Sequence, residues 1–237
     1  MASERLTSAD RTAFFAYLRR SVAFSEADLA PVETEAQLRR LPAHTAFLRC
    51  GDLAVDCGTV LTGLVREYFP LEDGREVTRG FAGPGDFVGS LSDLLRGQPA
   101  LSSVVAEADT RVAVVPWRRI RELIAQRPAW AEFHARVTER LYLAKAAREY
   151  ELLALDAEAR YHRFRTLYAA LEPAIALRHV ASYVGITPEH LSRLRRRLGS
   201  AAAGASSAAT PQDRSARPGT QLGAPPSPPR KVRRPSS

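Results

Sequence analysis

Residues 33–115 carry brief runs of alternating apolar and polar side chains, separated by residues that favour turns. The runs include TAFLRC, TVLTGLVREYFP and TRVAVVP, and the turns include Gly51-Asp52, Asp73-Gly74 and Gly83-Pro84-Gly85. Alternation with a period of two is typical of strands that bury one face, and many short strands at regular spacing are typical of antiparallel barrels and rolls. This segment therefore predicts an antiparallel β-roll of the jelly-roll type.

On both sides of the roll the apolar positions repeat with a helical period, so the fold class is α+β. Residues 7–31 predict two short helices, the second capped by Ser25. Strand signals end at Pro116, and residues 116–155 predict a long helical segment. The 29 residues from 127 to 155 would span about 43 Å at a rise of about 1.5 Å per residue.

One side of this long helix is apolar. A helix of that kind packs against a partner, so we expect two copies of the chain to pair in parallel along it. Packing against the chain's own roll is the alternative, and the two arrangements are compatible. The predicted dimer contacts are Phe133, Val137, Leu141, Ala144 and Arg148, and the seam also contains Trp130 and Leu152.

Residues 156–200 predict a small helical domain. Asp156 is placed to cap a helix whose apolar stripe ends at Leu171, and two short helices follow in LRHVASYVGITPEHLSRLRRRL. Gly185 can take the left-handed conformation that a sharp turn needs, and Thr187 with Pro188 marks the start of the second helix. Two helices at such a turn form a helix-turn-helix, an arrangement that reads DNA.

The last predicted helix has one apolar and one polar face. Its leucines recur at spacings of three and four and are expected to be buried. A helical hairpin with a merely solvated basic face is the alternative. The buried set is Leu191, Leu194 and Leu198, and the polar set is Glu189, Ser192, Arg193 and Arg196.

The chain has 237 residues, 45% of them hydrophobic, and a net charge of +8. Six basic residues and one acidic residue lie in segment 201–237, so residues 1–200 carry only +3. Positive charge in the folded part is concentrated at Arg193 and residues 195–197, as expected for a protein that binds an anionic polymer. Segment 201–237 consists mainly of Ala, Ser, Pro and Gly and predicts a disordered tail. Its basic end either adds non-specific attraction to phosphate or is a solvated extension without a role.

Several classes of function find no support in the sequence. The two cysteines, Cys50 and Cys57, form no metal-binding set, and we interpret them as reduced structural thiols in preference to a redox switch. The histidines are scattered, and no GxxxxGK[ST], HExxH or GxSxG motif occurs, so we expect neither an enzyme, a metal nor a cofactor. No apolar run approaches the roughly 20 residues of a membrane span, and the N-terminus lacks the pattern of a secretory signal. We expect a cytoplasmic protein that does not enter a membrane.

The order of roll, long helix and helix-turn-helix resembles the Crp/Fnr family of bacterial transcription regulators. The segment TGLVREYFPLEDGREVTRGFAGPGDFVGSL is similar to the cyclic nucleotide-binding-like roll of that family. The segments AEARYHRF and HVASYVGITPEHLSRLRR are similar to a subgroup with a shortened winged-helix domain. The resemblance covers residues 8–198. It implies a sensor domain in residues 1–115, a dimerisation helix in 116–155, a DNA-binding domain in 156–200 and the tail in 201–237.

Members that bind cyclic nucleotides have a glutamate shortly after a turn glycine, here Gly89, and an arginine about ten residues later. The resemblance places these positions on Ser90 and on Ala100 or Leu101, which cannot hold the ribose or neutralise the phosphate. We therefore expect no binding of cyclic AMP or cyclic GMP, with Arg96 as the one nearby residue that could compensate. Ser102 and Ser103 remain as donors for another, unidentified small-molecule effector. The iron–sulfur branch of the family needs cysteines that this chain lacks.

The resemblance assigns contacts with bases to Glu189, Ser192 and Arg193, next to Pro188. Arginine donates two hydrogen bonds to guanine and glutamate accepts from the amino group of cytosine. Ser192 matches the Fnr branch, which favours a half-site of the TTGA type. Contacts with phosphates are expected from Thr187, Arg195 and Arg196.

The sequence therefore predicts a homodimeric transcription regulator on a palindromic operator of double-stranded DNA, with RNA polymerase as a further partner if it activates. The alternative is a module that senses a cyclic nucleotide or another small molecule and acts through a protein partner.

Overall fold

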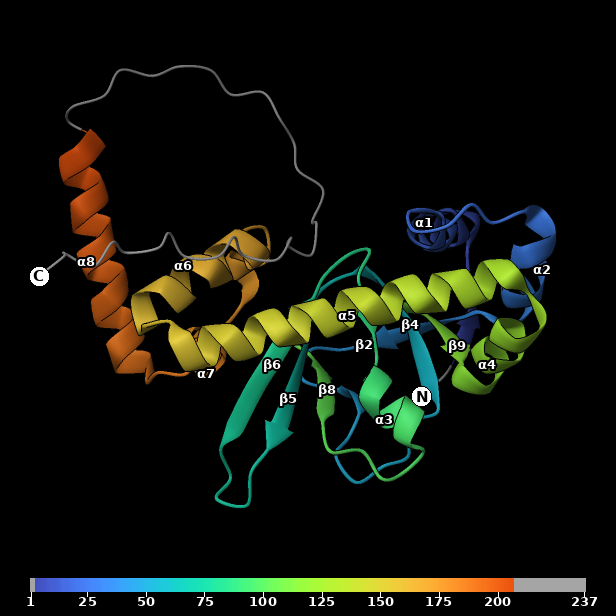
Figure 1. Ribbon diagram of the computed structural model, residues 1–237, viewed down its shortest axis with the longest axis horizontal. Helices are drawn as coiled ribbons and strands as arrows, with labels where there is room; N and C mark the ends of the chain where they lie inside the picture. Colours follow the sequence, from blue (N-terminus) through green and yellow to red (C-terminus); the bar gives the residue numbers. More distant parts are fainter. Residues whose placement is uncertain (1–2, 207–237) are drawn as a thin grey trace, which may run out of the picture.

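The computed structural model describes residues 3–206 and contains the predicted roll, built from two antiparallel sheets (Figure 1). The first sheet has the order β1-β2-β9-β4-β7 and the second the order β3-β8-β5-β6. The strands of the first sheet are β1 (Ser3–Arg5), β2 (Gln37–Leu41), β9 (Thr110–Pro116), β4 (Asp56–Thr62) and β7 (Phe87–Val88). Those of the second are β3 (Ala46–Leu48), β8 (Ser103–Ala106), β5 (Val65–Pro70) and β6 (Glu76–Ala82).

Alternation along the strands fills the interior of the roll with aliphatic side chains, as the sequence pattern predicts. Val60, Val104 and Val112 are almost fully buried there. The predicted turns are confirmed, since Gly51, Gly74 and Gly85 all have positive φ. In the roll, the edge strand β1 and the short helix α3 (Leu91–Arg96) between β7 and β8 were not predicted. Both are too short to produce a periodic pattern.

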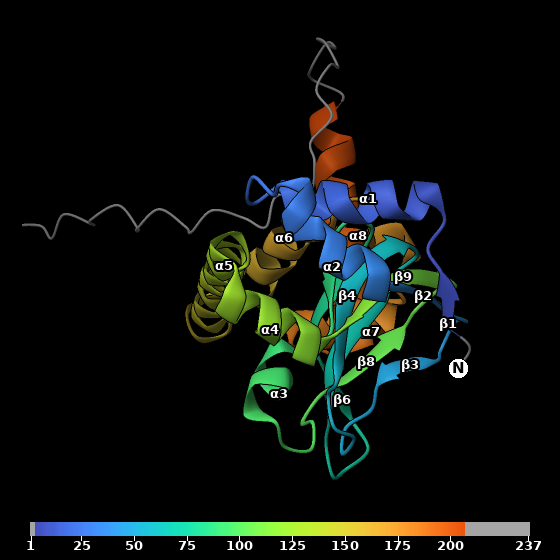
Figure 2. The same ribbon diagram turned by 90° about the vertical axis from the view of Figure 1, so that its right-hand side faces the viewer.

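Four helices pack outside the roll around a second hydrophobic core, which contains the outward-facing Cys57 and Val115. Figure 2 shows α1 lying across the sheet that contains β4 and β9. Thr7 and Ser25 cap α1 and α2 with complete capping boxes, which confirms the predicted cap of the second helix. The helices are α1 (Ser8–Arg19), α2 (Glu26–Glu35), α4 (Trp117–Gln126) and α5 (Pro128–Ala154).

The long helix α5 runs along the molecule from these helices to the C-terminal ones (Figure 1). Its predicted apolar side is divided between two environments. Trp130 is buried in the core formed with α1, α2 and the roll, and Val137 is buried beside residues of α1 and β4, which is the predicted alternative packing. The second half of α5 exposes Tyr142 (70%) and Leu153 (81%). The structure thus uses the first half of the helix for intramolecular packing and leaves apolar surface on the second half.

Four C-terminal elements form the helical domain around a third core: α6 (Ala157–Tyr168), the 3-10 helix η1 (Glu172–Ala174), α7 (Leu177–Val184) and α8 (Pro188–Ser206). Asp156 caps α6, as predicted, by accepting from the N–H of Ala159 at 2.8 Å. Helix α8 continues through Ser206, past the predicted tail boundary at residue 200, because an alanine-rich sequence propagates a helix readily. Within residues 3–206 no strand follows β9, so this part of the chain has no wing. The rest of the predicted tail, from residue 207, lies outside the described residues.

Candidate nucleic-acid interface and sensor pocket

The turn between α7 and α8 lies where the sequence predicts the turn of a helix-turn-helix. Gly185 ends α7 in the left-handed conformation (φ +79°), and its N–H donates to Ala181 O at 2.9 Å, as does the N–H of Ile186 at 3.1 Å. Thr187 then caps α8, because its hydroxyl accepts from the N–H of His190 at 3.2 Å. Leu191 and Leu194 are buried in the core of the domain. The predicted turn, cap and buried face are all present.

The opposite face of α8 is exposed and positively charged. Glu189, Arg193 and Arg196 are exposed and Ser192 is partly exposed. Within the described residues neither Arg193 nor Arg196 forms an ion pair, whereas Arg195 lies 3.8 Å from Glu172 and Arg197 pairs with Glu158 at 2.5 Å. An exposed guanidinium without a carboxylate partner is available to a phosphate or to a guanine edge.

Glu189 lies at the N-terminus of α8, and its carboxylate is held in the charged form. Hydrogen bonds from its own backbone N–H and from the side chain of Thr187, together with the nearby charge of Arg193, lower the pKa of Glu189. A charged carboxylate only accepts hydrogen bonds, so it suits an amino group such as that of cytosine. Thr187 is engaged in capping α8, and it also stands at the exposed start of the helix.

The preceding helix, α7, is docked on the roll at the edge strand β6. The hydroxyl of Ser182 accepts from the N–H of Thr78 at 2.9 Å and donates to Glu76 O at 2.7 Å. Ser182 therefore replaces a neighbouring strand at two backbone groups that would otherwise lack a partner. Phe81 extends the contact, because its ring lies 6.2 Å from Phe164 and 6.1 Å from Tyr183, measured between centroids.

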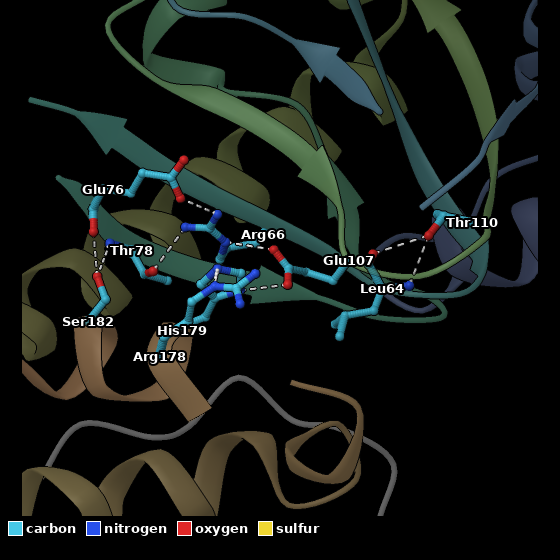
Figure 3. Close-up of polar contacts among 9 residues, drawn as sticks. All are labelled: Leu64, Arg66, Glu76, Thr78, Glu107, Thr110, Arg178, His179 and Ser182. Atoms are coloured by element: carbon cyan, nitrogen blue, oxygen red, sulfur yellow. Dashed lines mark hydrogen bonds and ion pairs between the residues drawn. The ribbon is translucent and has the colours of Figure 1, made fainter. Parts of the chain in front are cut away.

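Beside Ser182 a buried polar cluster joins α7 to the roll (Figure 3). Arg66 on β5, with 4% of its side chain exposed, donates to Glu107 at 2.7 Å and to Glu76 at 2.6 Å. The other carboxylate oxygen of Glu107 lies 2.6 Å from Nδ1 of His179. Arg178 donates to Nε2 of His179 at 3.1 Å, so Nδ1 carries the hydrogen shared with Glu107. We call Arg66, Glu107 and His179 the interdomain cluster.

Glu107 is the carboxylate that connects the two domains, and the structure stabilises its charge. Burial acts to raise its pKa, but the hydrogen bonds from His179 and Arg66 outweigh burial and lower the pKa of Glu107. Its side chain is only 5% exposed. Loss of either cationic or hydrogen-bonding partner would leave a buried charge unpaired.

The residues of the predicted effector pocket lie around α3, where several of their polar groups bind one another. The carboxylate of Asp93 accepts from the N–H of Leu101 at 3.2 Å, from the N–H of Ser102 at 3.4 Å and from the hydroxyl of Ser102 at 2.8 Å. Burial acts to raise the pKa of Asp93, but the hydrogen bonds from Ser102 and from the backbone N–H groups lower it. A carboxylate therefore occupies the donors that a bound anion would need.

The other residues of the predicted pocket either form hydrogen bonds within the chain or have no polar side chain. Ala100 is buried and has no polar side chain, and the hydroxyl of Ser90 is 3.2 Å from that of Ser92. Arg96, which could compensate for the missing arginine, donates to Asp93 at 3.3 Å. The hydroxyl of Ser103 accepts from the N–H of Cys50 at 2.9 Å. Gly89 adopts a positive φ before α3, and Leu101 is exposed.

The sequence model of one protein family, the cyclic nucleotide-binding domain, matches residues 38–127. A curated relative, the cyclic AMP receptor protein of Thermus thermophilus, is 32% identical over 177 residues, which cover 70% of this chain and 81% of the relative. The chain belongs to the Crp/Fnr family.

Solved structures of Crp/Fnr-type regulators have the same fold. FixK2 from Bradyrhizobium japonicum has a TM-score of 0.63 at 23% identity, and the match covers 70% of this chain and 86% of that one. The c-di-GMP-responsive regulator CLP from Xanthomonas campestris has a TM-score of 0.60 at 20% identity, with 75% and 93% covered. The α+β fold predicted from the sequence is thereby confirmed.

The predicted dimer contacts of this Crp/Fnr chain fall into three groups. Phe133 and Val137 face the chain's own core, as their packing above shows. Leu141 and Ala144 are partly exposed. Arg148 binds the backbone carbonyl of Tyr183 and lies over its ring at 4.1 Å, so it holds α5 to α7 of the same chain. The exposed apolar residues on the second half of α5 are Tyr142, Leu143, Tyr150, Leu152 and Leu153.

The sequence analysis missed Asp93 and the interdomain cluster. Their partners are separated by 72 residues in the case of Glu107 and His179, and no spacing rule connects such positions. A weak signal was present, because His179 and Ser182 are polar and share one face of α7. Within the described residues no group of three or more potential metal ligands occurs, and no helix is long and apolar enough to cross a membrane.

Proposed function

We propose that the protein is a sequence-specific DNA-binding transcription regulator that acts as a homodimer on a palindromic operator in the bacterial cytoplasm. The observation that carries the proposal is the face of α8, where Arg193 and Arg196 are exposed and have no ion-pair partner among residues 3–206, on a capped helix of a helix-turn-helix. Membership of a family of transcription regulators supports the same conclusion.

In this proposal Glu189, Ser192 and Arg193 read bases in the major groove. Arg193 donates to guanine, Glu189 accepts from cytosine, and each such contact contributes roughly 1–3 kcal/mol of discrimination. Thr187, Arg195 and Arg196 bind phosphates and set the register of the helix without reading sequence. RNA polymerase is a further partner if the protein activates transcription.

The dimer is formed along the second half of α5. Tyr142, Tyr150 and Leu153 lie on exposed surface where a soluble monomer would normally place polar residues. Of the contacts predicted from the sequence, Leu141 and Ala144 remain next to this surface, whereas the other three serve the chain's own packing. A two-fold axis beside α5 would present two copies of α8 to half-sites about one helical turn of DNA apart.

The roll does not bind cyclic AMP or cyclic GMP in this proposal. Asp93 occupies the N–H donors of Leu101 and Ser102, and Arg96 is bound to Asp93. A cyclic phosphate would meet a buried carboxylate in place of an arginine, and two anions in contact repel each other.

The test is a selection of random duplex oligonucleotides on the purified full-length protein without added ligand, at two salt concentrations. We expect an enriched palindrome whose half-sites contain the base pairs read by Glu189 and Arg193. Salt-sensitive binding without sequence preference would contradict ligand-independent recognition. Tight binding of a small molecule by a protein without affinity for DNA would favour the alternative, a sensing module that acts through a protein partner.

A further inference from the structure

An apolar cavity of about 50 Å³ lies outside the roll, between the outer face of β4 and the helices α1, α4 and α5. Its walls are almost entirely aromatic and aliphatic, and they include Tyr17, Phe87, Trp117 and Val137. A site for one water molecule needs roughly 10–15 Å³ by this kind of measure, so the cavity has room for several heavy atoms. It is distinct from the pocket at Asp93, because Cys57 and Thr59 line it with side chains that point away from the interior of the roll.

Two polar groups in this apolar wall lack a hydrogen-bond partner among the described residues. The hydroxyl of Thr59 on β4 is buried, with 1% of the residue exposed, and Nε2 of His134 on α5 is likewise buried. Both residues line the cavity, Thr59 from β4 and His134 from α5. One turn further along the same face of α5, the hydroxyl of Thr138 also lacks a partner.

Unsatisfied buried polar groups are rare in native proteins, because each one loses its hydrogen bonds to water without replacement. Because Thr59 and His134 line the cavity, a molecule inside it, an ordered water or a ligand, is placed to be the missing partner. The apolar walls exclude a charged or highly polar ligand. One hydroxyl or carbonyl group on a small apolar body would satisfy Thr59 and His134 together.

We propose that this cavity binds a small, largely apolar molecule, or the apolar end of a larger one, through a single hydroxyl or carbonyl group held by Thr59 and His134. The ligand would contact β4 and α5 at the same time. Helix α5 is bound to α7 through Arg148, which contacts the carbonyl and the ring of Tyr183, so occupation of the cavity would change the orientation of α7 and α8. This regulatory part rests on the proposed function, whereas the binding site itself does not.

The binding site is tested with the full-length protein labelled with ¹³C at the Ile, Leu and Val methyl groups, using 2-propanol as the probe. We expect saturable shifts of the methyl resonances of Leu18, Val115, Ile120 and Val137, which line the cavity. Resonances of Val60, Val104 and Val112 inside the roll serve as the internal control and should not move. Shifts that never saturate, or equal shifts in both sets, would overturn the proposal.

Two variants distinguish a specific binding site from a void left by imperfect packing. Thr59→Val keeps the shape of the wall but removes the hydroxyl, and we expect binding of 2-propanol to weaken about tenfold while the melting temperature without probe stays equal or rises. Cys57→Met fills the cavity with a flexible side chain and should abolish the saturable shifts. Thr12→Val on the exposed side of α1 is the matched control and should change neither quantity. Unchanged affinity in Thr59→Val would show that the cavity holds no specific site.

The proposed regulation is tested by measuring the affinity of each protein for the selected operator. We expect Cys57→Met to change this affinity at least several-fold and Thr12→Val to leave it unchanged. If the unmodified protein, Cys57→Met and Thr12→Val bound the operator equally and the probe still bound saturably, the cavity would be a binding site without a regulatory role. Absence of DNA binding by the unmodified protein would instead contradict the proposed function, and the methyl spectra would still report on the cavity.

Discussion

Helices α7 and α8 are adjacent in the chain and belong to one motif, yet polar side chains of α7 are bonded to the roll whereas those of α8 are exposed. On α7, Ser182 and His179 bind groups of the roll within 3 Å. On α8, Arg193 and Arg196 bind no described carboxylate. The contrast teaches that α7 anchors the motif to the roll, while α8 keeps two arginines exposed. Substitutions on α7 should therefore change stability, and substitutions on α8 should change recognition.

The largest effect is expected from removal of the Glu107 carboxylate, which joins α7 to the roll. In Glu107→Ala the buried guanidinium of Arg66 and the ring of His179 lose a shared partner, and we expect the free energy of unfolding to fall by about 3–5 kcal/mol. Chemical denaturation measures this change. Glu72→Ala, at an exposed position of the β5–β6 turn, is the control and should stay close to the unmodified protein. An effect of Glu107→Ala as small as that of the control would show that the cluster does not hold the domains together.

The exposed helix is tested by Arg193→Ala and Arg196→Ala. We expect Arg193→Ala to reduce discrimination at one base pair by roughly 1–3 kcal/mol, because a bidentate contact with guanine is lost. We expect Arg196→Ala to weaken all DNA sequences alike and to reduce the salt dependence, because a phosphate contact is lost. Binding to operator variants at several salt concentrations measures both. Identical profiles for the two variants would contradict the division into base and phosphate contacts.

A smaller effect is expected at the junction of α7 and β6. Ser182→Ala leaves the N–H of Thr78 and the carbonyl of Glu76 without their partner, which should reduce the free energy of unfolding by about 1–2 kcal/mol. The matched substitution on the exposed helix, Ser192→Ala, should change it by less than about 0.5 kcal/mol. A larger loss for Ser192→Ala than for Ser182→Ala would reverse the roles assigned to the two helices.

The smallest expected effect is the pH dependence of stability that arises where Glu107 joins α7 to the roll. The pKa of Glu107 is lower in the folded protein than the usual value of 4.5, so the charged carboxylate stabilises the fold above that pH. The contribution is lost as the pH falls through the lowered folded value. Denaturation curves of Glu107→Gln and the unmodified protein should therefore converge in acid and diverge toward neutral pH. A constant difference between them would show that the charge of Glu107 is not the stabilising feature.

Much of helix α8 was predictable from local sequence. Thr187, Pro188 and Gly185 mark a cap, a helix start and a left-handed turn by their own conformational preferences. The leucine spacing then fixes which face of α8 is buried, and Leu191 and Leu194 are indeed buried. Local rules suffice here because each signal acts within about one helical turn.

The region around α3, where the resemblance places an effector pocket, was predictable only in part. The sequence showed that Ala100 cannot neutralise a phosphate, but it did not show that Asp93 takes the place of the anion. Residues 93 and 102 come together because α3 folds back on the start of β8, where the side chain of Asp93 reaches two backbone N–H groups. The division of α5 was also unpredictable, since periodicity identifies an apolar side and not what will cover it.

The sequence by itself determined the elements, the roll, the helix-turn-helix and the exposed basic face of α8, because periodicity, caps and turn residues act locally. Only the tertiary structure decided which polar groups would be paired. It joined Glu107 to His179 across the domains, gave the donors of Leu101 and Ser102 to Asp93, and left Thr59 and His134 facing a cavity without partners. Hydrogen bonds and buried charges depend on distances of a few ångströms between residues far apart in the chain, and those distances exist only after the layers have packed.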